Sequence, residues 1–196
     1  ILDFNTDNPE VYSLIGVEYL FLEDFENAKD NFINCLNYDD SDYSALYNIV
    51  YCFEILEQNK NAIDYLNNYL DTNPYCEVAW HQLGKQYLFL KNYSKAISAF
   101  DFAIISDEYF IGAYIEKGRA LEKINQFTDA IENYKLIIAL KDESSYPLLR
   151  MGICNDKLGN YKKAIQNYTD CIKVDPQLNK AWYLLADIYY KNQKYN

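Results

Sequence analysis

The chain has 196 residues, of which 50% are hydrophobic and 24% charged, proportions that are ordinary for soluble proteins. Its formal net charge of −11 makes nucleic acid and anionic membrane surfaces poor partners for the chain as a whole. Only 6 glycines and 4 prolines occur, which argues against a loop-rich or disordered chain, and the 21 tyrosines suit half-buried faces between thin layers.

The sequence carries no sign of a membrane or secretory segment. No apolar run approaches the roughly 18 residues that a spanning helix needs, so we predict no membrane partner. A basic and then apolar start, typical of a signal peptide, is also missing. Because the first residue is Ile rather than Met, we interpret the sequence as a fragment, which leaves a removed signal open.

The five cysteines are odd in number and show neither a CxxC motif nor the spacing of metal ligands. They are Cys35, Cys52, Cys76, Cys154 and Cys171. We interpret them as small buried thiols in a reducing compartment, which predicts a cytoplasmic location. We predict no disulfide framework and no metal site.

Similar residues recur along the chain with a period of 34. Units of this length begin at Pro9, Tyr43, Glu77, Ile111, Ser145 and Asn179. One phase holds the glycines Gly16, Gly84, Gly118 and Gly152, and another holds the alanines Ala28, Ala62, Ala96, Ala130 and Ala164. A bulky residue follows each alanine by four positions, namely Phe32, Leu66, Phe100, Tyr134 and Tyr168. Self-similarity at a fixed period of this length indicates a stack of repeats.

The third unit, residues 77–110, shows best what each unit is expected to form. Its first half places apolar or small residues three, one and three positions apart, which predicts one face of an α-helix. These residues are Trp80, Leu83, Gly84 and Tyr87. After a turn that contains Asn92, the residues Ala96, Phe100 and Ala103 form a second helical face. Helices of about 12–14 residues are marginal alone, so stacking on neighbours must hold them.

This pattern resembles the tetratricopeptide repeat, whose first helix carries Trp, Leu, Gly and Tyr and whose second carries Ala, Phe, Ala and Pro. The third unit matches best, although Glu108 replaces its closing proline. The fifth unit follows with Gly152, Gly159, Tyr161, Ala164, Tyr168 and Pro176, although Asn155 stands where an aromatic residue is usual. The resemblance implies an all-α fold, a right-handed superhelical solenoid of antiparallel helix pairs.

The register predicts five repeats, at residues 9–42, 43–76, 77–110, 111–144 and 145–178. Residues 1–8 are expected to be the tail of a preceding repeat. Residues 179–196 are either the first helix of a sixth repeat or a capping helix. Trp182, Leu185 and Tyr189 make that helix apolar on one face only, which fits a cap, but both alternatives stay open.

Nothing in the sequence favours an enzyme. His81 is the single histidine, so a histidine metal cluster is excluded, and a catalytic triad or a general base that needs a partner histidine is absent or crippled. The glycines are isolated within helices, so no glycine-rich phosphate loop is present. We predict no catalytic, cofactor-binding or metal-binding residues and no cofactor.

The remaining candidate site is a surface for protein recognition. The resemblance implies that the first helices of the repeats line a concave groove. The residues beside their packing face are tyrosines, amides and cations, which suit an extended or helical peptide. The predicted peptide-binding residues are Tyr47, Asn48, Tyr51, His81, Lys85, Arg119 and Arg150.

The charges of these helices allow two interpretations. Lys85, Arg119 and Arg150 could form a positive track on an acidic chain and bind a peptide that carries carboxylates. Alternatively, Glu116, Glu122 and Asp156 neutralise the track, and the face is merely solvated.

The two ends of the chain suggest a second function. Residues 1–42 carry eleven acidic residues and one basic residue, whereas residues 145–196 carry eight basic and four acidic residues. A structural module could therefore associate head to tail with copies of itself. The first unit also has apolar residues, Leu14, Val17, Leu20 and Phe21, where later units are polar. Earlier repeats, a partner or the segment Ile1–Asn8 could cover them.

Overall fold

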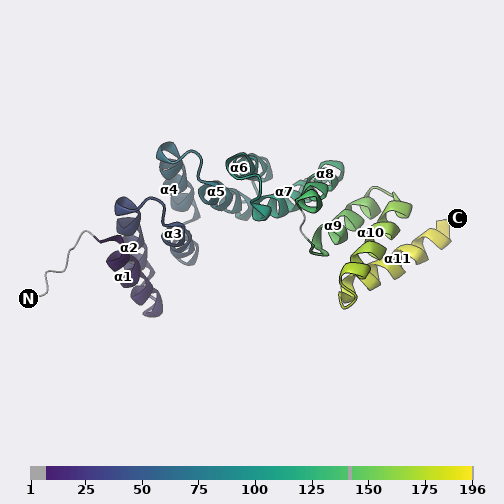
Figure 1. Ribbon diagram of the computed structural model, residues 1–196, viewed down its shortest axis with the longest axis horizontal. Coiled ribbons are helices and arrows are strands. Elements are labelled where there is room, and N and C mark those ends of the chain that lie inside the picture. Colours follow the sequence, from purple (N-terminus) through teal and green to yellow (C-terminus); the bar gives the residue numbers. More distant parts are fainter. Residues whose placement is uncertain (1–7, 141–142, 196) are drawn as a thin grey trace, which may run out of the picture. The chain divides into compact units, whose positions relative to one another are not determined.

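The computed structural model describes residues 8–140 and 143–195, with side chains up to Lys191 (Figure 1). Within these ranges the chain forms eleven α-helices and no β-strand, so the prediction of an all-α fold is confirmed. The segment Ile1–Asn8, predicted to be the tail of an earlier repeat, lies outside the described residues except for Asn8. No helix in the described ranges combines the length and apolar character that crossing a membrane requires.

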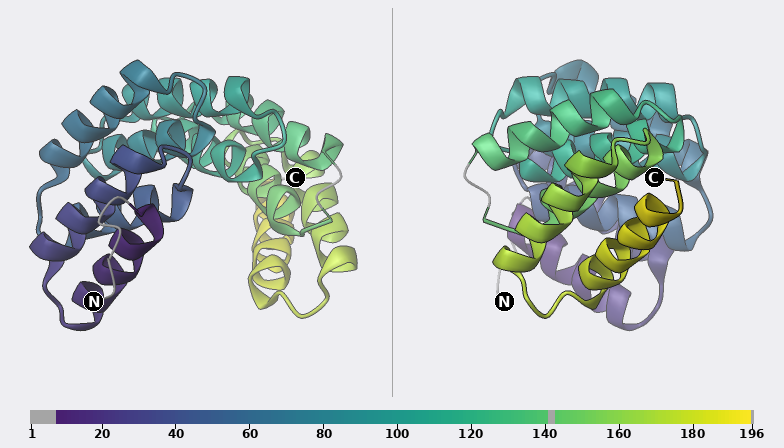
Figure 2. Two further views of the ribbon diagram at one scale, coloured as in Figure 1. Left: turned by 60° about the vertical axis from the view of Figure 1, so that its left-hand side comes forward. Right: turned by 90° about the vertical axis from the view of Figure 1, so that its right-hand side faces the viewer.

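The helices belong to two compact units, each larger than the 34-residue units of the sequence. We call them unit 1 (residues 1–90) and unit 2 (residues 91–196). Unit 1 contains α1 (Pro9–Phe21), α2 (Phe25–Tyr38), α3 (Tyr43–Ile55), α4 (Asn59–Thr72) and α5 (Glu77–Phe89). Unit 2 contains α6 (Tyr93–Ser106), α7 (Ile111–Lys123), α8 (Phe127–Ala139), α9 (Tyr146–Lys157), α10 (Tyr161–Val174) and α11 (Asn179–Tyr195). Within each unit, neighbouring helices run side by side in opposite directions (Figure 2).

Several helices begin at a residue whose side chain caps the first turn. Asn8, Asp24, Asp42 and Asn92 each accept a hydrogen bond from a backbone N–H of the helix that follows. The Cys76 thiol does the same for α5, at 3.4 Å from the Ala79 nitrogen. These bonds satisfy donors that a helix leaves free at its start.

The turn between the two helices of each pair has a constant backbone shape. Glu23, Glu57, Lys91, Asn125 and Gly159 have positive φ angles between 57° and 73° and lie 34 residues apart. This left-handed conformation is unfavourable for residues other than glycine and asparagine. Its recurrence at Glu23 and Glu57, both within unit 1, indicates that the packing of the paired helices imposes the turn there.

The phase of the glycines lets the two helices of a pair approach closely. A Cβ atom added at Gly16 would lie 2.8 Å from the Phe32 ring, and one at Gly118 would lie 2.5 Å from the Tyr134 ring. A Cβ atom added at Gly152 would lie 2.4 Å from the Tyr168 ring. In the second pair, α3 and α4, these two positions hold Val50 and Leu66, both buried. A larger residue in the first helix is thus matched by a smaller one in the second.

Candidate functional site

A pocket in unit 1 brings four of the predicted peptide-binding residues together. Its volume is about 290 Å³, near the lower end for ligand clefts. Helix α3 supplies Tyr47, Asn48, Val50, Tyr51 and Glu54, and helix α5 supplies Gln82 and Lys85. The residues lie one helical turn apart along each helix, so adjacent helices present them toward the same space.

The mouth of this pocket offers two phenols and one ammonium group. Tyr47 is 40% exposed and Tyr51 is 46% exposed, and the Tyr51 ring packs edge-on against Phe25 at 6.3 Å. Burial and the Glu77 carboxylate raise the pKa of Tyr47, so its hydroxyl stays a hydrogen-bond donor at neutral pH. Among the residues that the structure describes, no carboxylate lies within ion-pair distance of Lys85. The Lys85 charge is therefore available to a ligand.

Two buried glutamines lie on α5, and one of them, Gln82, lines the pocket. Both polar atoms of the Gln86 amide are hydrogen-bonded. Nε2 donates to Glu54 Oε1 at 2.7 Å, and Oε1 accepts from Asn59 Nδ2 at 3.1 Å. Gln82 is 2% exposed, and its buried Oε1 has no hydrogen-bond partner in the described part of the chain. A buried acceptor without a donor costs about 1–3 kcal/mol.

His81, a further predicted site residue, is partly buried on α5 and does not line this pocket. Burial, assisted by the neighbouring Lys85 charge, lowers the pKa of His81 to about 4. The imidazole is consequently neutral at pH 7. Neutral His81 adds no positive charge to the surface.

The pH dependence of stability should reveal this burial. The pKa of His81 is about 4 in the folded chain and about 6.5 when unfolded, so between these values the unfolded chain binds more protons. Stability therefore rises with pH across this window and falls on acidification. We expect the parent to lose up to about 2 kcal/mol more than H81Q between pH 7 and pH 4 in urea titrations. Since the sequence holds one histidine, equal losses would contradict a buried His81.

Unit 2 holds the predicted residues Arg119 and Arg150, and both are engaged by carboxylates. Arg119 Nη1 lies 2.7 Å from Glu116 Oε1, and its side chain is 54% exposed. Arg150 of α9 makes a bidentate ion pair with Glu122 of α7. The Arg150 side chain is 22% exposed and the Glu122 side chain 10%. Asp156 pairs instead with Lys191, at 3.3 Å. These pairs are those expected if the acidic residues neutralise the face.

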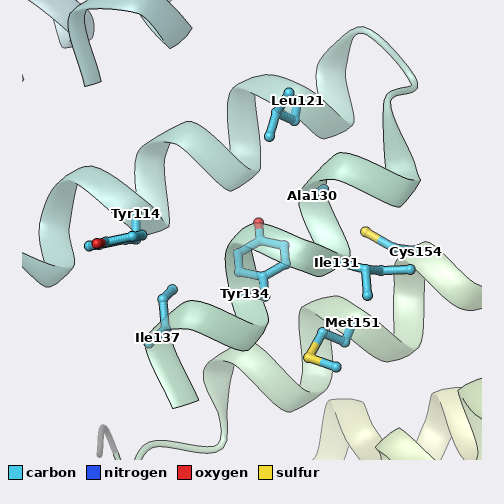
Figure 3. Close-up of a cluster of buried hydrophobic side chains, with 8 residues drawn as sticks. All are labelled: Tyr114, Leu121, Ala130, Ile131, Tyr134, Ile137, Met151 and Cys154. Carbon is cyan, nitrogen blue, oxygen red and sulfur yellow. The ribbon is translucent and has the colours of Figure 1, made fainter. Parts of the chain in front are cut away.

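The Glu122 carboxylate also ties this ion pair to the core of unit 2. The Tyr134 hydroxyl donates to Glu122 Oε1 at 2.7 Å. Figure 3 shows the Tyr134 ring among the buried side chains, with its hydroxyl directed toward the helix that carries Tyr114 and Leu121. Arg150 is thus part of the packing between α7, α8 and α9.

A second pocket, of about 330 Å³, lies in unit 2 and was not predicted. Ile131, Met151 and Asn155 contribute to it, and Lys135 and Lys163 also line it. Asn155 occupies the phase in which other repeats have Phe53, Tyr87 and Leu121, and its amide donates to the Met151 carbonyl and to Asn167. The loss of a large side chain at this phase is the sequence signal that could have revealed the pocket.

The described residues contain no cluster of three or more His, Cys, Asp or Glu side chains that could hold a metal ion. All five cysteines are buried free thiols. Burial raises the pKa of Cys52 to about 11 and that of Cys154 to about 12, so both remain protonated. Protonated, buried thiols are poor nucleophiles.

Comparisons with known proteins agree with this architecture. The family model of the tetratricopeptide repeat matches residues 9–42 and 147–178. The TPR repeat-containing protein MJ1428 of Methanocaldococcus jannaschii is 26% identical over 187 residues, which cover 95% of this chain and 30% of the relative. A DnaJ homolog subfamily C member 7 homolog of Dictyostelium discoideum is 23% identical over 181 residues, again 30% of the relative. The chain thus spans about 30% of the length of these curated relatives.

Solved structures show the same fold at low sequence identity. MamA is 19% identical with a TM-score of 0.72, covering 88% of this chain and 94% of its own. YrrB, described as a TPR protein with an unusual peptide-binding site, is 17% identical with a TM-score of 0.69, covering 91% and 92%. A tetratricopeptide repeat protein of Parabacteroides merdae is 15% identical with a TM-score of 0.75, covering 95% and 74%. Two stretches of the chain thus match the tetratricopeptide repeat, and the chain has the all-α solenoid fold of tetratricopeptide repeat proteins.

Proposed function

We propose that this chain is a non-catalytic protein-interaction module that binds an extended peptide in the pocket between α3 and α5. Tetratricopeptide repeat proteins generally mediate protein–protein interaction. The observation that carries the proposal is the meeting, in one pocket, of two half-exposed tyrosines and a Lys85 that has no ion-pair partner among the described residues. Free thiols are compatible with a cytoplasmic setting, and the proposal involves no cofactor, nucleic acid or membrane.

The groups of the pocket suit different parts of one acidic peptide. Lys85 would pair with an Asp or Glu side chain, and the rings of Tyr47 and Tyr51 would cover its neighbours. The proposal centres on unit 1, because Arg119 and Arg150 already have carboxylate partners.

Reversing the charge of Lys85 should test this assignment. We expect K85E to weaken binding to a library of acidic peptides about tenfold, equivalent to about 1.4 kcal/mol, because repulsion replaces attraction. The matched control is K60E, which changes the net charge equally on the exposed surface of α4. Fluorescence anisotropy at fixed salt gives both affinities, and circular dichroism checks the fold. If K60E weakened binding as much as K85E, the pocket would not be the site.

Self-association is a second candidate, favoured by exposed apolar side chains in both terminal helices. Leu14, Phe21 and Leu22 are 68–79% exposed at α1 and the turn after it, and Tyr183 and Tyr190 are 71% and 68% exposed in α11. The opposite charges of the two end regions would attract copies head to tail. Salt-dependent sedimentation, included in the experiment below, distinguishes this candidate from peptide binding.

A further inference from the structure

One face of α11 is exposed to solvent, although its residues have the spacing that forms a helix–helix contact in other repeats. We call it the open face. Trp182, Ala186 and Tyr189 lie four and three residues apart, so they share one face. The same phases in α3 hold Leu46, Val50 and Phe53, which are 0%, 1% and 6% exposed. In α7 they hold Tyr114, Gly118 and Leu121, which are also buried. In α11, by contrast, Trp182 is 51% exposed and Tyr189 is 49% exposed.

The rest of unit 2 fixes α11 through the side opposite to this exposed face. Ala181 and Ile188, both 0% exposed, pack with Tyr168 and Cys171 of α10. Lys191 forms ion pairs with Asp156 of α9 at 3.3 Å and with Asp187 of α11 at 2.7 Å. Because α11 is fixed from the other side, its open face is ordered before any partner arrives.

Trp182 is also held in the orientation that the repeat uses elsewhere. Its indole nitrogen donates to the Pro176 carbonyl at 3.0 Å. Trp80, in the same phase, donates to the Pro74 carbonyl at 2.8 Å. The same bond at both positions indicates that Trp182 is oriented on its helix as Trp80 is on α5.

Ala186 determines which kind of helix this face can accept. In α1, α7 and α9 the same phase holds glycine, and an added Cβ would lie within 2.8 Å of the aromatic ring of the second helix. Ala186 has such a Cβ atom, so an aromatic ring in that position would collide with it. The pair α3–α4 shows the compatible alternative, since Val50 of α3 is matched by Leu66 of α4.

We propose that the open face of α11 binds one amphipathic helix of a partner protein, packed as α4 packs on α3. This helix carries a small residue at the position of Ala62 and a leucine or isoleucine, not an aromatic residue, at the position of Leu66. Acidic residues beside its apolar face would favour binding, because residues 145–196 carry eight basic and four acidic residues. A second copy is a poorer occupant, since Gly16, the small residue of α1 that precedes a leucine by four positions, is already buried against Phe32, and Ala181 of α11 is buried as well. This inference is independent of the pocket in unit 1.

A helical peptide with the α4 sequence, residues 59–72, provides the probe. A lactam bridge on its solvent face keeps it helical, since a free segment of this length is marginal. The matched peptide carries L66F, and a scrambled peptide is the negative control. The indole N–H signal of Trp182, assigned with W80F, reports binding in NMR titrations of the whole chain.

We expect the leucine peptide to bind at least tenfold more tightly than the L66F peptide and to shift the Trp182 signal. In A186G the missing Cβ should admit the ring, so the preference should disappear or reverse. No binding of the leucine peptide, or the same preference in A186G, would overturn the proposal. Sedimentation of the chain alone is run at low and high salt. Concentration-dependent association that shifts the Trp182 signal would make a second copy the occupant and also overturn it, whereas a monomer that binds the leucine peptide supports it.

Discussion

Replacing Glu122 by leucine is expected to lower the free energy of unfolding by about 3 kcal/mol. The substitution leaves the Arg150 guanidinium partly buried without its carboxylate, and it removes the acceptor of the Tyr134 hydroxyl. R150M alone should cost about 2 kcal/mol, less than E122L, because Tyr134 still donates to the Glu122 carboxylate. Urea unfolding followed by circular dichroism measures both effects.

The double variant E122L/R150M is the control for this interpretation. Apolar side chains of similar volume often replace a buried ion pair at little cost. We therefore expect the double variant to lie within about 1 kcal/mol of the parent, which is much less than the sum of the single changes. If both single variants cost less than about 1 kcal/mol, solvent would be screening the pair and Arg150 would be free for a ligand.

The environment of this ion pair keeps its members in the required ionisation states. Burial and the adjacent Glu122 carboxylate both raise the pKa of Tyr134, so the hydroxyl keeps the proton that it donates. Burial acts against the Arg150 charge, but the hydrogen bonds and charge of Glu122 outweigh it and raise the pKa of Arg150. Reversing the charge of Arg150 would therefore disturb folding as well as any binding. Lys85 is the better position for a binding test.

The fold was predictable because one period encodes both helices of each pair. The alanine phase, Ala28, Ala62, Ala96, Ala130 and Ala164, is 0% exposed at every repeat. The bulky phase four residues later is also fully buried, from Phe32 to Tyr168. Burial at a helix contact depends on spacing along the sequence, which the sequence displays directly. The right-handed superhelix and the repeat boundaries stay predictions.

The turns between paired helices were less predictable. Asn125 and Gly159 are residues that tolerate a left-handed conformation, but Glu23, Glu57 and Lys91 are not. Closing an antiparallel pair requires this φ angle at one position, whatever residue stands there. Local residue preference therefore carried little information about the turn, whereas the period located it.

The candidate site was predictable only in part, because identity and spacing do not tell which charges pair. Lys85 and Arg150 both lie beside the packing face of a first helix, at different phases of the repeat. Arg150 pairs with Glu122, 28 residues away, whereas Lys85 has no such partner in the described chain. The choice depends on how side chains cross between neighbouring helices. The periodicity places Tyr47, Asn48, Tyr51 and Lys85 near one another, and the pocket contains all four.

Replacing Gly16 by alanine is expected to destabilise the chain by about 1–3 kcal/mol. Helix propensity alone predicts the opposite sign, because alanine is favoured over glycine within a helix by about 1 kcal/mol. The added Cβ, however, would lie 2.8 Å from the ring of Phe32, which is fully buried and cannot move without cost. This pair is more suitable than Gly118 and Tyr134, because the Tyr134 hydroxyl also donates a hydrogen bond to Glu122.

The compensating substitution follows from the Val50 and Leu66 pair of the second repeat. F32L should cost about 1 kcal/mol alone by removing buried contacts, but it should also make room for the Cβ of G16A. We therefore expect the double variant G16A/F32L to be more stable than the sum of the single effects by at least about 1 kcal/mol in urea unfolding. N34A, on the exposed face of α2, shows how large a gain from helix propensity is in this chain where no side chain is in the way. Additive effects in the double variant would show that the ring of Phe32 does not determine the need for glycine at position 16.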